Sequence, residues 1–320
     1  MNPTYLDAID MSPWAGREDP EADSLRWHQV VEPLSQATTT PGVALVGFAC
    51  DAGVARNQGR IGAAKGPRAL RQALAPLAWH RQGPAVDAGD IVCHGDDDME
   101  AAQARLAERV AELLAKDHLP IVLGGGHEVA FGSWSGLARH LAAGDGPAPR
   151  VGIINFDAHF DLRDPAQVRS SGTPFAQIAE ACQDRGWPFR YACLGVSRAA
   201  NTRALFSRAQ ELGVLVREDH EITPARLDSL GDELAAFTGQ CDLVYLTLDI
   251  DVLPACEAPG VSAPAAHGVP LALLEPLLTR VRDSGKLALI DLAELNPDFD
   301  IDRRTARAAA RLIHHLTLNG

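Results

Sequence analysis

Short apolar runs typical of buried β-strands recur along this 320-residue chain, and helical patterns separate them. Strands buried on both faces are hydrophobic at nearly every position, so this alternation favours a parallel sheet covered by helices on both sides. No break in composition divides the chain. We therefore expect one α/β domain over residues 1–320, with an irregular N-terminal extension over about the first forty. The expected strands are Val43–Ala49, Pro120–Leu123, Val151–Phe156, Tyr191–Val196, Val214–Arg217, Leu243–Leu248 and Leu287–Leu292.

Helical patterns lie between these runs, and a proline stands at the start of three of them. Proline suits the first helical turn because its missing N–H would have no partner there in any case. The expected helices include Pro67–Ala78, Met99–Lys116, Pro224–Phe237, Pro270–Val281 and a last one over Arg303–Leu316.

Composition excludes several classes of function. The formal net charge of −13 argues against nucleic acid or an anionic membrane surface as a partner. No stretch approaches the roughly 18 apolar residues of a membrane-spanning helix, and Met1–Asp23 does not resemble a signal peptide. The six cysteines are far apart and form no C-x-x-C pair, as is typical of reduced thiols. We expect a soluble, cytoplasmic protein.

Acidic residues and histidines follow several of the expected strands. Gly124–Glu128 contains a glycine triplet and His127, Asp157–Asp161 reads Asp-Ala-His-Phe-Asp, and Asp249–Asp251 reads Asp-Ile-Asp. Glu294 follows the last strand. Carboxyl ends of parallel strands meet at one edge of the sheet, where ligands bind, so these groups should gather there. Residues two apart, such as Asp157 and His159, would point the same way if the strand continued.

Two imidazoles and four aspartates in one place suit a pair of divalent cations. Four neighbouring carboxylates cannot all ionise cheaply, and two cations would balance their charge. This ligand set suits Mn²⁺, and less exclusively Zn²⁺, Fe²⁺ or Co²⁺. Such a pair would activate water for hydrolysis. Any one cluster alone is commonly a solvated turn, and the coincidence of three favours the metal site. The candidate ligands are His127, Asp157, His159, Asp161, Asp249 and Asp251.

These motifs resemble those of the arginase/agmatinase (ureohydrolase) family, and most closely those of its formimidoylglutamase branch. Asn57–Arg68 is similar to the family's N-terminal loop and Asp291–Pro297 to its C-terminal motif, so the resemblance spans about residues 40–318. It implies a three-layer, doubly wound, mostly parallel eight-stranded sheet, two Mn²⁺ per subunit, and a homo-oligomer, either a trimer or a hexamer. The branch hydrolyses N-formimidoyl-L-glutamate to L-glutamate and formamide in histidine degradation.

The resemblance also implies a role for each motif residue. Asp157 and Asp249 would bridge the ions. Glu294 corresponds to the glutamate that pairs with the planar cationic head of the substrate, where it would orient the reacting carbon. Asp157, Asp249 and Glu294 are thus the candidate catalytic residues. One ion would be held by His127, Asp157, Asp161 and Asp249, and the other by Asp157, His159, Asp249 and Asp251.

Three departures separate this chain from arginine-hydrolysing members of the family. Gly124–Glu128 replaces their Gly-Gly-Asp-His-Ser. Leu253 stands where an aspartate that is not a ligand usually precedes Pro254. Ser171 lies near the position of the histidine that shuttles protons in arginine hydrolysis. Proton shuttling of the arginase type is therefore in question.

Arg163 bears on the substrate. It stands where arginases carry an asparagine that contacts the amino-acid end of the substrate, and a guanidinium suits a carboxylate. Formimidoylglutamate has two carboxylates, whereas agmatine is a dication that Arg163 would repel. We expect a small anionic amidine as substrate, with Arg198 and Arg60 as further candidates for binding it. The alternatives are hydrolysis of another guanidino acid with release of urea (guanidinobutyrase, agmatinase or arginase type), a non-catalytic homologue, and a deacetylase-like metallohydrolase.

Overall fold

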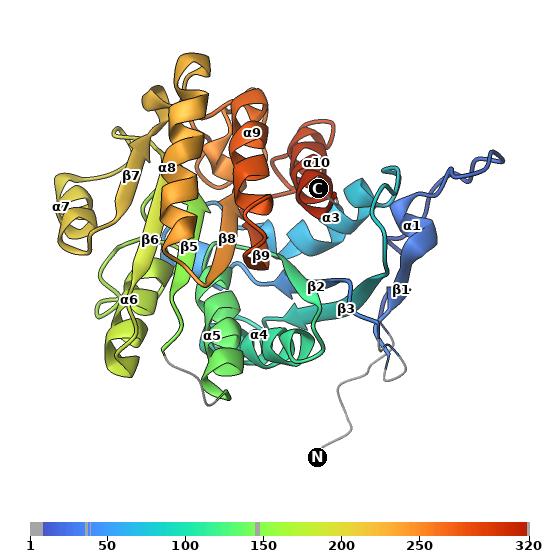
Figure 1. Cartoon of the computed structure of the whole chain (residues 1–320), viewed down its shortest axis with the longest axis horizontal. Helices are drawn as coiled ribbons and strands as arrows, with labels where there is room; N and C mark the ends of the chain where they lie inside the picture. Colours follow the sequence, from blue (N-terminus) through green and yellow to red (C-terminus); the bar gives the residue numbers. More distant parts are fainter. Residues whose placement is uncertain (1–8, 36–37, 39, 145–147, 319–320) are drawn as a thin grey trace.

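One parallel sheet organises the molecule. The computed structural model describes residues 9–35, 38, 40–144 and 148–318. Within these residues nine strands pair in the order β1-β3-β2-β4-β9-β8-β5-β6-β7, and every neighbouring pair is parallel (Figure 1). The strands are β1 Val31–Pro33, β2 Val43–Ala49, β3 Ala85–Val92, β4 Leu119–Leu123, β5 Val151–Phe156, β6 Arg190–Val196, β7 Leu215–Glu218, β8 Leu243–Asp249 and β9 Leu287–Ala293.

The sequence missed two of these strands. The seven expected strands are confirmed to within two residues at each end. The family resemblance implied eight strands in total, but the described sheet has nine, because β1 and β3 are also present. Within the first forty residues, which we expected to be irregular, the structure has α1 (Trp27–Val30) and β1, and residues 1–8, 36, 37 and 39 of that segment lie outside the described residues. β3 carries Asp87, Gly89 and Asp90, which break the apolar pattern. β1 has only three residues and ends at Pro33, which an edge strand tolerates.

Helices cover both faces of the sheet. One buried apolar cluster joins the sheet to α3, α8, α9 and α10, and a second joins it to α4, α5, α6 and α7 (Figure 1). The expected helices are present, although Pro224 lies in a 3₁₀ turn before α8 and Pro270 immediately precedes α9. The remaining bounds are α2 Ala52–Arg56, α3 Gly66–Leu74, α4 Met99–Leu114, α5 Val129–Ala142, α6 Pro174–Arg185, α7 Arg203–Glu211, α8 Leu227–Gly239, α9 Leu271–Arg282 and α10 Arg304–Thr317.

Buried polar contacts fasten both α3 and the N-terminal segment to β3. Arg71 of α3 binds both carboxylate oxygens of Asp87, at 2.6 and 2.9 Å, and one oxygen of Asp90 at 2.5 Å. Trp14 donates its indole N–H to Asp87 at 2.7 Å. Asp87 is fully buried and the Arg71 side chain is 3% exposed. These bonds explain how a strand that contains a buried acid, Asp87, is stable at this position.

The strand order brings the candidate site together. β4, β9, β8 and β5 are consecutive neighbours in the sheet. Along the chain, however, β5 is the next strand after β4, so β9 and β8 lie between two strands that are successive in sequence. This reversal of strand order creates a crevice outside the carboxyl ends of the strands, where open α/β sheets bind ligands. The four acid- and histidine-bearing segments follow these four strands. No helix in the described part of the chain is long and apolar enough to cross a membrane.

Candidate metal centre

Two groups of side chains with metal-ligating atoms lie beyond the central strands. The first contains His127, Asp157, Asp161 and Asp249, and the second contains Asp157, His159 and Asp251. In the first group, the Nδ1 atom of His127 lies close to the Oδ2 atoms of three aspartates. The distances are 3.1 Å to Asp157, 3.0 Å to Asp161 and 3.2 Å to Asp249. In the second, Nδ1 of His159 lies 3.0 Å from Asp251 and 3.5 Å from Asp157.

The two groups share Asp157. Its Oδ2 faces His127 and its Oδ1 faces His159, as a bridging carboxylate would require. Asp249 belongs to the first group only, so the arrangement of ligand atoms supports one of the two expected bridges directly.

A tight turn, rather than an extended strand, aligns the ligands within each motif. The Oδ1 atom of Asp157 accepts the N–H of His159 at 2.6 Å, and that of Asp249 accepts the N–H of Asp251 at 2.8 Å. β5 has already ended at residue 156, and β8 passes into a 3₁₀ turn at residues 250–252. The predicted proximity of the side chains is confirmed, but the predicted reason, continuation of the strand, is wrong.

Asp161 reaches the site through an unusual backbone conformation. Its φ is +48°, in the left-handed region that non-glycine residues rarely adopt. Glu294 has the same feature, with φ at +67°. The sequence prediction required the chain to curl back directly after β5 for Asp161 to serve as a ligand, and this conformation provides that reversal. Strained residues of this kind cluster at functional sites.

Polar residues inside the strands orient the ligands. Nε2 of His127 lies 2.9 Å from the hydroxyl of Thr247, and Asn155 donates to Oδ2 of Asp157 at 2.9 Å. The first contact leaves Nδ1 of His127 facing the carboxylates. Sequence reasoning missed both partners. Each stands two residues before an aspartate at the end of its strand, so strand alternation could have found them.

The carboxylates are buried together, which makes their charge costly. Burial, followed by Asp251 and Asp157, raises the pKa of Asp249 well above its usual range. Burial and Asp157 also raise the pKa of Asp161. Burial lowers the pKa of His127, but the surrounding carboxylates outweigh it and hold that pKa well above its ordinary value.

The residues fit a pair of divalent cations. Nδ1 of His127 is buried and makes no hydrogen bond of normal geometry among the described residues, although three carboxylate oxygens surround it. A lone-pair donor aimed into a group of carboxylates has the geometry of a metal ligand. Cations would also neutralise the excess negative charge of the buried aspartates.

Two further acids, Glu294 and Glu128, are buried next to these groups. Glu294 is 5% exposed, and its Oε1 accepts the backbone N–H of His127 at 2.9 Å. Burial, followed by the charge of Glu128, raises the pKa of Glu294 to about 8. Burial raises the pKa of Glu128 to about 7. The Oε2 atom of each acid lacks a hydrogen-bond partner in the described structure.

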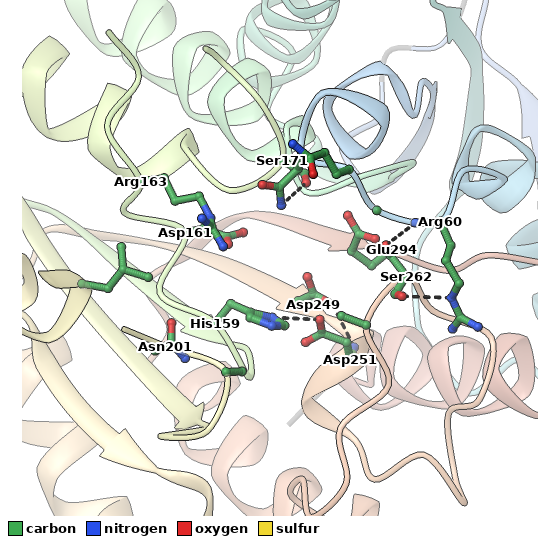
Figure 2. Close-up of a pocket in the computed structure, with 16 residues that line it drawn as sticks. Arg60, His159, Asp161, Arg163, Ser171, Asn201, Asp249, Asp251, Ser262 and Glu294 are labelled. Carbon is green, nitrogen blue, oxygen red and sulfur yellow. Dashed lines mark hydrogen bonds and ion pairs between the residues drawn. The ribbon is translucent and has the colours of Figure 1, made fainter. Parts of the chain in front are cut away.

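A cavity of about 320 Å³ opens over the two groups. This volume is at the small end for a site that holds a metabolite. In Figure 2, His159, Asp249 and Asp251 converge at its centre, with Arg163 to one side and Glu294 to the other. The side chain of Arg163 is exposed and has no ion pair or hydrogen bond with any described residue. It therefore contributes an uncompensated positive charge to the cavity.

The other two predicted substrate-binding arginines differ in position. Arg60 lines the cavity, but its guanidinium binds the carbonyls of Val261 and Ser262 and lies over the ring of Phe299. Arg198 does not line the cavity. Its guanidinium binds Glu218, and its side chain is 69% exposed. The expectation that Arg198 binds the substrate is therefore corrected, since its charge is already paired elsewhere.

Other cavity residues include some that sequence reasoning missed. Ser171, which stands near the family's proton-shuttle position, lies in the wall and accepts a hydrogen bond from Asn57 at 3.3 Å. Asn201 was not predicted. Its amide donates to the carbonyl of Ala158 at 2.9 Å, and its oxygen accepts the N–H of Phe160 at 3.1 Å, which fixes the loop between the ligands. An asparagine in a loop after β6 gives no sequence signal for such a role.

Comparison with known proteins places the chain in a family. The model of the arginase family matches residues 41–318 of this chain. The chain belongs to the arginase family. Among curated arginase-family relatives, it is 61% identical to a formimidoylglutamase of Aeromonas hydrophila over 96% of this chain and 98% of the relative. It is 55% identical to a formimidoylglutamase of Ralstonia nicotianae, over 95% of this chain and 94% of the relative.

Solved structures agree with the family assignment. The crystal structure of Trypanosoma cruzi formiminoglutamase with Mn²⁺ superposes with a TM-score of 0.76 at 26% identity, over 87% of this chain and 93% of that one. Formimidoylglutamase from Bacillus subtilis has the same fold, with a TM-score of 0.80 at 22% identity over 95% and 94%. The fold predicted from the family resemblance is confirmed apart from the strand count.

Proposed function

We propose that this chain is a Mn²⁺-dependent hydrolase that converts N-formimidoyl-L-glutamate and water to L-glutamate and formamide. The observation that carries the proposal is an uncompensated guanidinium, Arg163, in the same cavity as two groups of metal-ligating side chains that share Asp157. Such a cavity suits an anionic substrate with a hydrolysable head. The high identity to relatives named formimidoylglutamase supports the same substrate.

The proposed metal ligands are the six side chains of the two groups. Two Mn²⁺ ions held there would supply a water molecule acidified enough to act as the nucleophile near neutral pH. Asp157 and Asp249 are the proposed bridging ligands, and Asp157 has one oxygen toward each histidine. The ligands are His127, Asp157, His159, Asp161, Asp249 and Asp251.

Glu294 and Arg163 are proposed to orient the substrate from opposite sides. Glu294 is anchored to the backbone N–H of His127 through Oε1, which leaves Oε2 free to bind the amidine N–H groups. Arg163 would bind a substrate carboxylate. Held at both ends, the amidine carbon would face the nucleophile, and fixing that geometry lowers the entropic cost of reaction. Arg60 is retained only as a wall residue, because its guanidinium is engaged.

The reaction balances without any other reactant. Water adds to the amidine carbon, the bond from that carbon to the glutamate nitrogen breaks, and a proton passes to that nitrogen. The products are formamide and L-glutamate. Hydrolysis of a guanidino acid by the same steps would release urea instead, which makes the product a direct test of the substrate.

The proposal extends to the whole protein. We propose a single domain over residues 1–320, because one sheet carries both apolar clusters, and a cytoplasmic, homo-oligomeric enzyme of histidine degradation.

A product assay tests the function. Purified protein loaded with Mn²⁺ is incubated separately with N-formimidoyl-L-glutamate, guanidinobutyrate, agmatine and arginine, and formamide and urea are both measured. We expect formamide from the first substrate and little urea from the others. Urea from a guanidino acid, with no formamide, would replace this proposal with the guanidino-acid alternative.

Metal analysis separates an enzyme from a non-catalytic homologue. We expect about two Mn²⁺ per chain after loading, loss of turnover on treatment with a chelator, and recovery when Mn²⁺ is restored. A loaded protein that retains no metal would favour a non-catalytic role.

A further inference from the structure

The cavity wall formed by residues 57–60 is held by two carboxylates, one of them fully buried, that do not themselves line the cavity. This wall directly follows α2, and all four of its residues line the cavity. The backbone of α2 binds it closely, because the N–H of Asn57 donates to Gly53 at 3.0 Å and that of Gly59 to Val54 at 2.8 Å. The position of α2 therefore bears directly on the position of the wall, which Ser262 also holds by accepting the N–H of Arg60 at 2.9 Å.

Glu128 holds the first turn of α2. Its Oε1 accepts the N–H of Gly53 at 2.9 Å, at a position where the helix offers no partner of its own. Asp51, the residue that precedes the helix, does not fill this role. Its carboxylate instead accepts the N–H of Gly62, at 2.7 Å, beyond the far end of the wall. Two acids thus fix the segment from both ends.

The packing around Glu128 is specific to its carboxylate. The residue is 1% exposed. A β-carbon added at Gly53 or at Gly126 would overlap its Oε2 atom, so the carboxylate fills the space that side chains at those two positions would need. Gly126 and Glu128 also replace the aspartate and serine of the arginase-type motif. The two departures are adjacent in space, since the Glu128 carboxylate as placed here occupies the space that a side chain at position 126 would take.

We infer that Glu128 is a positioning residue: it acts through Gly53 and α2 to set the wall at residues 57–60 against the metal-ligating groups. It does not line the cavity, so its side chain acts on the wall through the backbone of α2. The expected effect on kinetics rests on the proposed function, whereas the expected effect on the wall does not.

Hydrogen exchange of the backbone amides over residues 52–60 tests the structural part. Three variants are compared with the unmodified protein: Glu128→Ala removes the acceptor, Glu128→Gln keeps it, and Gln103→Ala is the control. Gln103 donates to the backbone carbonyl of Glu128 at 2.7 Å, so its loss disturbs the same residue without removing the carboxylate. We expect exchange at least about tenfold faster in Glu128→Ala, and close to that of the unmodified protein in the other two. Exchange in Glu128→Ala no faster than in Gln103→Ala would overturn the inference.

Gly53→Ala gives an independent test if Glu128→Ala fails to fold. The added methyl group would displace the carboxylate from the other side while keeping Glu128 itself. We expect the same faster exchange over residues 52–60. Unchanged exchange in this variant would overturn the inference equally.

Kinetics test the consequence for the site. For N-formimidoyl-L-glutamate, we expect Glu128→Ala to raise KM by about tenfold or more, with a smaller change in kcat and with Mn²⁺ content unchanged, and Glu128→Gln to restore most of the affinity. An unchanged KM together with faster exchange would overturn the role in substrate binding. If the unmodified protein does not hydrolyse this substrate, the proposed function fails, and the exchange comparison still decides the structural inference.

Discussion

At the scale of single residues, the same small device forms both halves of the candidate metal centre. In each motif an aspartate at the end of a strand accepts the N–H of the residue two positions later, and both residues of the pair belong to the candidate metal centre. This is the usual behaviour of aspartate in turns, where its side chain bonds to the backbone two residues on. The first aspartate of each motif therefore both builds the turn and offers a ligand oxygen.

Asp157 should be the most sensitive ligand, because it belongs to both groups. We expect Asp157→Asn to lower Mn²⁺ content and to reduce turnover more than 100-fold, since changes to residues behind the ligands already cost about 10–100-fold. Metal analysis of the purified variant and a formamide assay would measure both effects. Asp164→Asn is the control. Asp164 is an exposed acid in the same loop, and its carboxylate accepts the backbone N–H of Ala166 at 3.0 Å. A fully loaded, active Asp157→Asn variant would refute the assignment.

Arg163 and Arg198 form a matched pair for testing substrate recognition. Both are exposed arginines, but only Arg163 lines the cavity. We expect Arg163→Ala to raise KM for N-formimidoyl-L-glutamate by about 10–100-fold, the range expected for loss of a hydrogen bond to a charged group. Steady-state kinetics should show little change for Arg198→Ala. Equal KM values in the two variants would remove Arg163 from substrate binding.

At the scale of secondary-structure elements, β3 shows how tertiary contacts can stabilise a strand that its own sequence disfavours. Its buried Asp87 is tolerable only because Arg71 and Trp14 bind it from α3 and from the N-terminal segment. The same contacts hold the N-terminal segment against the edge of the sheet. This is also why sequence periodicity missed the strand, since its partners lie 16 and 73 residues away.

Removing this acid should destabilise the fold. We expect Asp87→Ala to lower the free energy of unfolding by about 3–5 kcal/mol, the usual result when one member of a buried ion pair is lost. Chemical denaturation would measure the change. Glu108→Ala removes a partner of the exposed Glu108–Arg139 pair and should cost less than about 1 kcal/mol. Similar losses in the two variants would show that the buried pair has no special role.

At the scale of the whole molecule, strand order creates the site. The ligands come from segments that follow β4, β5 and β8, and Glu294 follows β9, which lies between β4 and β8 in the sheet. Residues separated by more than 160 positions therefore meet, as the 2.9 Å bond between Glu294 and the N–H of His127 illustrates. The two apolar clusters on either side of the sheet make this rim rigid.

The proposed oligomer can be tested on the intact protein. We expect a trimer or a hexamer, with a mass three or six times the 34.1 kDa of one chain. Sedimentation equilibrium or light scattering over a range of concentrations would measure it. A mass of one chain at every concentration would contradict the proposal.

The sequence alone determined which side chains are candidates for metal ligation, because that chemistry depends on residue type and on short spacings after apolar runs. It predicted seven of the nine described strands, and it singled out the six side chains and Glu294 that the structure brings together at the rim, whose roles as ligands and substrate-binding residue stay predictions. Only the tertiary structure decided which charges are free. The sequence offered both Arg163 and Arg198 as candidates for binding a carboxylate, and they differ in the structure because Glu218 pairs with Arg198 and no described residue pairs with the side chain of Arg163. Likewise, Glu128 was visible only as a departure from a motif until the fold placed Gly53 beside it. Charge compensation and packing depend on contacts between distant segments, and local sequence does not encode these.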